Sequence, residues 1–362
     1  MEVEDLNCTQ FGDQFPPPGT DAAGNNTLLR VLTTIVKTYQ PFHYYIYVTI
    51  VVFSVFANFF ILLVLAQKEM RCVGVNVTMM LIAVCDFSCS IAAVIQQFLR
   101  AIENYDSYFI AYSRITVDYL SVAFHASSLF LAVGMAFCRV MSLNMSNRNR
   151  EKWQTPKYAF CISLICAPVF ILASTVLFVN SVEQSEEDGI YLQISDLSLK
   201  NHCLFMKISL VINGSCFKAL PCIMMMLLSF FLLAKIKEGR TNVIGASNQQ
   251  NKNEKIDRSS RFIQFVLVVF VVTESPQALF SIIGGLFIND YLNYYQTLAS
   301  IMNTLSIFNT TTSFIIYSSL SAKFRKLFIA IFLPSSIIEK IYRKRSTIVV
   351  QPTQTSSRVL HA

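Results

Sequence analysis

The sequence predicts an all-α membrane protein: a bundle of seven transmembrane helices followed by a short amphipathic eighth helix. Of its 362 residues, 54% are hydrophobic and only 14% are charged, whereas about 25% of the residues in soluble domains are charged. Seven apolar runs are long enough to span a bilayer, because an α-helix needs about 20 residues to cross the hydrocarbon core. The lipid bilayer is therefore the first partner that the sequence implies.

The chain divides into four predicted segments. Residues 1–43 are expected to form a disordered extracellular N-terminus, because this stretch is polar and contains the run Pro16-Pro17-Pro18-Gly19. The bundle follows over 44–320, the amphipathic helix over 321–333 and a cytosolic tail over 334–362. The transmembrane helices are expected at 44–66, 77–99, 115–140, 158–179, 204–234, 262–288 and 298–320.

The stretch after the seventh run is too short and too basic to cross the membrane. It places Lys323, Arg325 and Lys326 beside the aromatic residues Phe324 and Phe328. Cations and apolar residues interleaved at this spacing are typical of a helix that lies along the membrane surface.

The distribution of lysine and arginine predicts the orientation. Seven basic residues lie between 235 and 261 and eight between 323 and 358, whereas residues 1–40 contain only Arg30 and Lys37. Basic residues concentrate on the cytosolic side, so we expect an extracellular N-terminus in the plasma membrane. The net charge of +7 therefore belongs to the cytosolic face, and we predict no nucleic-acid partner.

Two glycosylation sequons lie in the predicted extracellular segment, at Asn7 and Asn25, and we expect both to be glycosylated. Four further sequons fall in predicted cytosolic or membrane segments, so we interpret them as chance matches; they begin at Asn76, Asn144, Asn213 and Asn309.

Two opposite charges in the predicted spans point to a polar interior. Glu274 lies mid-span beside Pro276, where a carboxylate costs about 3 kcal/mol unless it faces a cavity or a partner. Lys218 lies roughly 16 Å and Glu274 roughly 20 Å below the outer surface, counted at 1.5 Å per residue. We hypothesise that they pair or compete for the same ligand group; the alternative is that each is solvated separately in a wet cavity.

Other polar residues also lie inside the spans. Asp86 is near mid-membrane, and Ser128 and Arg139 share a face of the third helix, with Arg139 at its cytosolic end. Arg139 there either meets a partner protein or reaches the headgroups. His125, taken alone, is typical of a satisfied core histidine. We assign six residues to the ligand cavity: Glu274, Lys218, Gln277, Asp118, Ser121 and Gln96.

The ionisable residues in the spans do not indicate an enzyme. Asp118, His125, Lys218 and Glu274 show no recognised metal or nucleophile spacing. We therefore predict neither catalysis nor a cofactor. A channel or transporter would need rings of like charge or broken helices in paired halves, and the sequence shows neither.

Taken in order, these residues resemble the rhodopsin-like family of G-protein-coupled receptors over about residues 44–332. Asn58 and Asp86 match the polar residues of the first two helices, Arg139 the arginine of the Asp-Arg-Tyr motif, Pro276 the proline of the sixth helix and Tyr317 the end of Asn-Pro-x-x-Tyr. The chain departs from the family at Cys138 before Arg139, at Glu274 in place of a tryptophan, and at Ser313-Phe314 in place of Asn-Pro.

A narrower resemblance rests on four short motifs. It is to the myosuppressin-type and FMRFamide-like peptide receptors and to the related nematode serpentine receptors of class W. The motifs are Thr273-Glu274-Ser275-Pro276-Gln277, Lys218-Ala219-Leu220-Pro221-Cys222, Asp257-Arg258-Ser259-Ser260-Arg261 and Ser321-Ala322-Lys323-Phe324-Arg325.

The resemblance implies a receptor that signals by ligand-driven helix rearrangement. Its partners would be an extracellular ligand and a heterotrimeric G protein, which would couple through Arg139 and Tyr317. An amidated neuropeptide is the favoured ligand, and the alternative is a chemosensory receptor for an environmental small molecule.

The resemblance also implies a sodium site and a disulfide. Asp86, Ser128 and Asn309 match the positions that hold the ion in many family members; a water-filled polar network is the alternative. Arg114 stands where the family has a cysteine that pairs with the second outer loop. Cys203 supplies the loop cysteine, so we predict that it pairs with Cys8.

Overall fold

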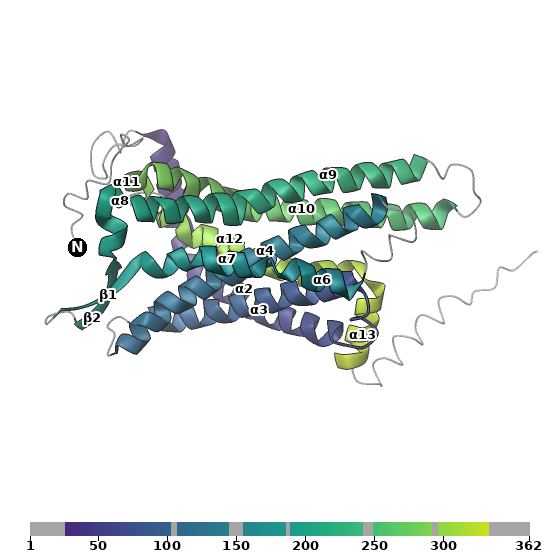
Figure 1. Cartoon of the computed structure of the whole chain (residues 1–362), viewed down its shortest axis with the longest axis horizontal. Coiled ribbons are helices and arrows are strands. Elements are labelled where there is room, and N and C mark those ends of the chain that lie inside the picture. Colours follow the sequence, from purple (N-terminus) through teal and green to yellow (C-terminus); the bar gives the residue numbers. More distant parts are fainter. Residues whose placement is uncertain are drawn as a thin grey trace, which may run out of the picture.

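The described helices group into seven segments, which run along the length of the molecule (Figure 1). The computed structural model describes residues 26–102, 107–144, 155–185, 189–241, 249–291 and 296–332. The first three segments and the seventh are single helices, and the other three are composite. In order they are α2 (Thr27–Leu65); α3 (Gly74–Arg100); α4 (Tyr108–Asn144); α6 (Pro156–Ser163), α7 (Cys166–Ala173) and η1 (Ser174–Phe178); α8 (Asp196–Val211), η2 (Ile212–Ala219) and α9 (Leu220–Thr241); α10 (Gln249–Leu286) and α11 (Ile288–Asp290); and α12 (Gln296–Leu320).

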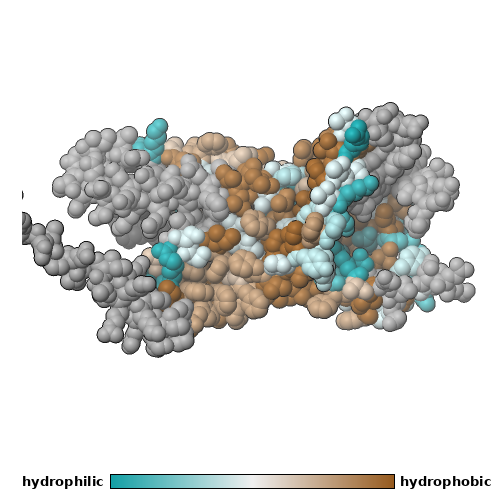
Figure 2. All heavy atoms as spheres, turned by 180° about the vertical axis from the view of Figure 1, so that it is seen from behind, coloured by the Kyte–Doolittle hydropathy of each residue, from teal (hydrophilic) through white to brown (hydrophobic). Residues whose placement is uncertain are grey.

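The outer surface of the bundle is suited to lipid. Within the described residues, six segments are long and apolar enough to cross a membrane, and α12 covers the range predicted for the seventh span. Figure 2 shows apolar side chains over the middle of the molecule and hydrophilic ones gathered toward its two ends. This distribution matches a protein whose central belt contacts hydrocarbon.

The first helix is longer than predicted. It begins at Thr27, so residues 27–43, which we expected to be disordered, are helical. Asn26 caps it: its side-chain oxygen accepts hydrogen bonds from the backbone N–H groups of Leu28 and Leu29, at 3.1 and 3.3 Å. The threonines that made this stretch look polar bond back into the helix, as Thr34 does to the carbonyl of Arg30 at 2.8 Å.

A buried polar cluster joins three helices near their middle. Ser54 of α2 lies 2.6 Å from the hydroxyls of both Ser90 of α3 and Thr310 of α12. Asn58, one turn further along α2, donates to the Thr310 carbonyl at 3.1 Å. Because these side chains are buried, their mutual hydrogen bonds help to fix how the three helices pack.

An antiparallel hairpin, which the sequence analysis did not predict, covers one end of the bundle. It consists of β1 (Asn180–Ser185) and β2 (Gly189–Ile194), paired from Asn180 with Ile194 to Ser185 with Gly189. Ile190 packs on Ala111 near the start of α4, and Tyr108 donates to the Gln184 side chain at 2.9 Å. Below, we call this end of the molecule the hairpin end.

The predicted amphipathic helix is present at the opposite end (Figure 1). It is α13 (Ala322–Phe332), and the Ser321 hydroxyl caps it by accepting the Phe324 N–H at 3.1 Å. Phe324 is 1% exposed and packs against Phe314 and Phe328. We call this end the α13 end.

The fifth and sixth segments approach each other closely because glycines line their contact. A Cβ atom on Gly214 of η2 would lie 2.9 Å from both the Ala278 carbonyl oxygen and the Ile282 nitrogen of α10. A Cβ atom on Gly285 would lie 2.5 Å from Val211. Only residues without a side chain allow this separation, which places Lys218 of η2 beside Glu274 of α10.

We expect Gly214→Ala to lower the free energy of unfolding by about 1–3 kcal/mol, because the added methyl group meets backbone atoms that cannot rotate away. Thermal unfolding of the purified protein in detergent measures the effect. Ser215→Ala is the control, since the bonds of the Ser215 hydroxyl in the described part of the chain, to Val211 and Cys216, stay within its own segment. Equal melting temperatures for the two variants would show that the contact is not tight.

Candidate functional site

A fully buried carboxylate lies at the centre of the bundle. Glu274 is 0% exposed. Its Oε2 accepts from the Lys218 ammonium at 2.7 Å, and its Oε1 accepts from His125 Nε2 at 3.1 Å and from the Asn309 amide at 3.2 Å. Four segments therefore meet at one side chain: α4, η2, α10 and α12.

The network continues from Lys218 toward the hairpin end. The ammonium group also donates to the Ser306 hydroxyl at 3.2 Å, and this hydroxyl donates to the Gln277 side-chain oxygen at 2.7 Å. Lys218 and Glu274 thus neutralise each other in a site where an unpaired charge would cost several kcal/mol. The predicted pairing of these two residues is present.

Local helix geometry positions both members of this pair. Lys218 lies in the π-helical stretch η2, in which the wider turn changes the direction of the side chains that follow; such stretches often occur at functional sites. Glu274 lies two residues before Pro276 in α10. The proline leaves a backbone carbonyl of the preceding turn without its usual donor and weakens the helix there.

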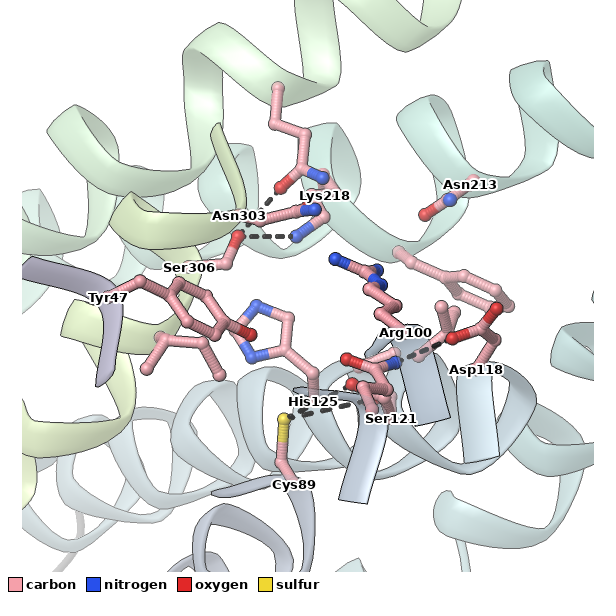
Figure 3. Close-up of a pocket in the computed structure, with 16 residues that line it drawn as sticks. Tyr47, Cys89, Arg100, Asp118, Ser121, His125, Asn213, Lys218, Asn303 and Ser306 are labelled. Atoms are coloured by element: carbon pink, nitrogen blue, oxygen red, sulfur yellow. Dashed lines mark hydrogen bonds between the residues drawn. The ribbon is translucent and has the colours of Figure 1, made fainter. Parts of the chain in front are cut away.

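A cavity of about 210 Å³ lies on the hairpin side of the Glu274 network (Figure 3). In this view Lys218, Asn303 and Ser306 lie on one side, Asp118 and Ser121 on another, and Arg100 extends between them. Both polar and apolar side chains line it: Tyr47, Cys89, Gln96, Arg100, Asp118, Ser121, Val122, His125, Ala126, Asn213, Phe217, Lys218, Gln277, Asn303, Ser306 and Ile307.

Five of the six residues that we assigned to the ligand cavity line it: Lys218, Gln277, Asp118, Ser121 and Gln96. The sixth, Glu274, is not among the lining residues; it lies beneath the cavity and reaches it only through Lys218 and His125. The sequence thus predicted that these segments face one cavity, but it did not show that the Glu274 carboxylate is covered by its own partners; that the cavity binds a ligand stays a prediction.

The wall of the cavity carries a second pair of opposite charges. Gln96 of α3 donates to the Asp118 carboxylate of α4 at 2.7 Å. The Arg100 guanidinium, at the end of α3, lies near Asp118 but is not hydrogen-bonded to it within the described residues. In addition to Lys218, the wall therefore offers the Arg100 cation and the Asp118 carboxylate to a bound molecule.

Sequence reasoning missed three polar residues of the cavity: His125, Arg100 and Asn213. His125 was interpreted as an ordinary core histidine, but it contacts Glu274 and lines the cavity; only its place on the same face of α4 as Ser121 and Ser128 hinted at this. Arg100 was not considered. Asn213, interpreted only as a chance sequon, also lines the cavity.

A second, smaller cavity lies on the other side of the Glu274 network. Its volume is about 60 Å³, and Asp86, Ser128 and Asn309, the three residues of the implied sodium site, all line it. Thr312 lines it as well, and its buried hydroxyl has no hydrogen-bond partner among the residues that the structure describes. Carboxylate, hydroxyl and amide oxygens are suitable ligands for a hard cation such as sodium, so these residues fit the ion.

The remaining predicted residues stay untested. Arg139 lies near the end of α4, and its backbone carbonyl accepts a hydrogen bond from the Ser142 hydroxyl at 2.9 Å. The side chain of Tyr317 is outside the described residues. Cys203 is disulfide-bonded. The described residues do not include Cys8, Asn7 or Asn25. The disulfide between Cys8 and Cys203 and the glycosylation of the two asparagines therefore remain predictions.

Comparisons with known proteins agree with this architecture. The model of the family described as serpentine type 7TM GPCR chemoreceptor Srw matches residues 44–334. The "G-protein coupled receptor dmsr-1" of Caenorhabditis elegans is 24% identical over an aligned length of 386 residues, which covers 91% of this chain and 75% of that protein.

The Lys218 and Glu274 substitutions should be strongly non-additive. We expect Lys218→Met alone to lower the free energy of unfolding by about 3–5 kcal/mol, because it leaves a buried carboxylate without its cation. The combination of Lys218→Met with Glu274→Gln should cost less than the sum of the two single changes by more than about 1 kcal/mol. Thermal unfolding of all four proteins measures this coupling. Additive losses would show that the two charges act independently.

Proposed function

The chain belongs to the serpentine type 7TM GPCR chemoreceptor Srw family, and from this premise we propose that its ligand is an amidated neuropeptide of the FMRFamide-like or myosuppressin-like class. As a member of that family it is a multi-pass membrane protein and a G-protein-coupled receptor, not an enzyme. The proposal therefore concerns the ligand, the orientation and the way in which the signal crosses the membrane.

The observation that carries the proposal is the polar cavity above the Glu274 network. It lies at the hairpin end and presents Asp118, Arg100, Lys218 and Gln277 from different helices. A peptide offers charged side chains and backbone amide groups together, so it can engage a wall that carries both signs of charge. The resemblance of four motifs to peptide receptors supports this ligand class further.

One observation favours the alternative of a chemosensory receptor for an environmental small molecule. The cavity volume of about 210 Å³ is below the roughly 300–1,000 Å³ of typical ligand pockets. Such a volume accommodates only the end of a peptide, and the remaining residues would contact the hairpin end outside the cavity. A small molecule would fit inside it completely.

We propose that the hairpin end is extracellular and the α13 end cytosolic, in the plasma membrane. The lysine and arginine bias supports this orientation. Arg139 and Tyr317 then lie toward the side on which a heterotrimeric G protein binds. Basic residues of α13, such as Lys323, would meet both that protein and anionic lipid.

Signal transfer in this proposal is a population shift. A ligand that bonds Lys218 or His125 better in one helix arrangement favours that arrangement. Because α4, η2, α10 and α12 share the Glu274 carboxylate, a change in these hydrogen bonds alters how all four pack. Pro276 provides a point at which α10 bends.

The first test is G-protein activation in transfected cells by a panel of amidated Arg-Phe peptides. We expect a nanomolar response that Arg139→Ala abolishes and Glu274→Gln reduces, because the first removes the contact with the G protein and the second disrupts the shared network. Lys157→Ala, which changes an exposed cation on α6, is the matched control and should respond like the wild type. Silence across the panel, with surface expression confirmed, would favour the small-molecule alternative.

We also propose that sodium binds between Asp86, Ser128, Asn309 and Thr312. When bound, the ion would neutralise the Asp86 carboxylate and hold α3, α4 and α12 together. Asn309 donates to Glu274 from its amide nitrogen at 3.2 Å, which leaves its oxygen for the cation.

We expect replacement of sodium by choline to change agonist affinity severalfold in the wild type and not in Asp86→Ala. Thr312→Val should weaken the sodium effect, because it removes an oxygen ligand while keeping the volume of the side chain. Binding measured across a sodium series gives both values. A wild type that is insensitive to sodium would indicate a water-filled polar network instead.

A further inference from the structure

Two thiols from different segments meet in the apolar interior of the bundle. Cys85 of α3 and Cys166 of α7 are free cysteines, and their side chains lie within hydrogen-bonding distance of each other. Cys166 also packs against the buried apolar cluster that contains Cys85. Cys89, by contrast, has its contact with a hydroxyl, that of Ser121 at 3.8 Å. A cysteine that only fills space needs no second thiol beside it, so this contact indicates a pair that can react.

The backbone around Cys166 departs from a regular α-helix. Pro168 has no N–H group, so the carbonyl of Leu164 lacks its usual helical donor; the Ala167 N–H bonds to it instead, at 3.3 Å. The N–H groups of Leu164 and Ile165 likewise bond to carbonyls three residues back, at 3.3 and 3.1 Å. These tighter turns interrupt segment four between α6 and α7, and their hydrogen bonds are poorer than those of an α-helix. Cys166 can therefore adjust its position by the small amount that disulfide geometry requires.

The two thiols differ in their access to the bilayer. Cys85 is buried, whereas Cys166 is partly exposed and follows the exposed apolar residues Leu164 and Ile165. Of the six spans identified in the described residues, segment four is the most open: 11% of its apolar stretch is buried, against 39–56% in the others. A small oxidant dissolved in the hydrocarbon therefore reaches Cys166 first, and Cys85 lies behind it as the resolving thiol.

A hydroperoxide is an oxidant that reacts with such a pair in two balanced steps. First, the Cys166 sulfur attacks the terminal oxygen of the hydroperoxide: an S–O bond forms, the O–O bond breaks, and the thiol hydrogen leaves with the alcohol, which gives a sulfenic acid. Next, the Cys85 sulfur attacks the Cys166 sulfur: the S–S bond forms, the S–O bond breaks, and the hydroxyl group leaves as water with the Cys85 hydrogen. The two thiols together lose two electrons, and the hydroperoxide gains them.

We propose that Cys85 and Cys166 are a modification site, at which a hydroperoxide that arrives from the bilayer links α3 to α7 by a disulfide. The contact between the two thiols and the adjustable turn at Cys166 carry the inference. It goes beyond the proposed function, because the reaction needs neither a ligand nor a G protein. Cys85 directly precedes Asp86, which lines the smaller cavity, so the new bond holds the α3 wall of that cavity against segment four.

Mass spectrometry of the full-length receptor in lipid nanodiscs tests the proposal. The receptor is treated with equal concentrations of cumene hydroperoxide, which dissolves in hydrocarbon, or of hydrogen peroxide, which dissolves in water. Free thiols are then blocked with N-ethylmaleimide in denaturant, and the protein is digested without reduction. We expect a peptide pair joined through Cys85 and Cys166 that a phosphine reductant separates. Because Cys166 opens toward hydrocarbon, cumene hydroperoxide should form this pair severalfold faster than hydrogen peroxide.

Three serine variants assign the two roles. In Cys166→Ser the linked pair should be absent, and Cys85 should stay open to N-ethylmaleimide. In Cys85→Ser no thiol resolves the sulfenic acid, so Cys166 should be found oxidised further, to the sulfinic acid. Cys161→Ser changes an exposed cysteine of the same segment and is the matched control; it should give the wild-type yield of the linked pair.

Thermal unfolding shows whether the bond fits the native bundle. After the oxidant is removed, the linked receptor should melt a few degrees higher than the reduced one, because the bond joins two segments that already touch; Cys166→Ser should show no such rise. A lower melting temperature would mean that the link distorts the bundle, and it would overturn the proposal. So would full blocking of both thiols after treatment, a link from Cys166 to another cysteine, or a faster reaction with hydrogen peroxide.

Discussion

The burial of the Glu274 carboxylate is the constraint on which the rest of the bundle depends. A side chain that is 0% exposed can stay ionised only if donors from other helices surround it, and here Lys218, His125 and Asn309 do so. The glycine contact at Gly214 and the π-helical turn of η2 bring Lys218 within reach. The close contact at Gly214 and the π-helical turn thus both serve to bring a cation to the buried carboxylate.

The same carboxylate lies between the larger and the smaller cavity described above. Lys218 and His125 connect it to the larger cavity, and Asn309, which bonds to Glu274 Oε1, also lines the smaller one beside Asp86. A change in the hydrogen bonds on one side therefore alters the donors available to the other. A ligand in the larger cavity and a cation in the smaller one would then be coupled through the Glu274 network and the Asn309 side chain.

Sequence alone predicted those features that depend on length, charge and depth. The spans follow from apolar runs, and the pairing of Lys218 with Glu274 follows from matching depths. The start of α2 at Thr27 was not predictable from composition, because its threonines bond to their own backbone. The contact of His125 with Glu274 was not predicted either, since a single histidine on an apolar helix has no partner at a recognisable spacing in the sequence. Its partner, the Glu274 carboxylate, lies 149 positions away in the chain.

In the proposed signal transfer, the charged network takes the place of an aromatic switch. The rhodopsin-like receptors that the chain resembles usually have a tryptophan where Glu274 stands, and an aromatic ring responds to a ligand through packing. An ion pair with a shared histidine responds instead through hydrogen-bond exchange, and its two charges must stay paired in every populated state, because an unpaired charge in this interior costs several kcal/mol. The arrangements available to α10 are therefore limited to those that keep Lys218 and Glu274 in contact or that supply a ligand group in place of one of them.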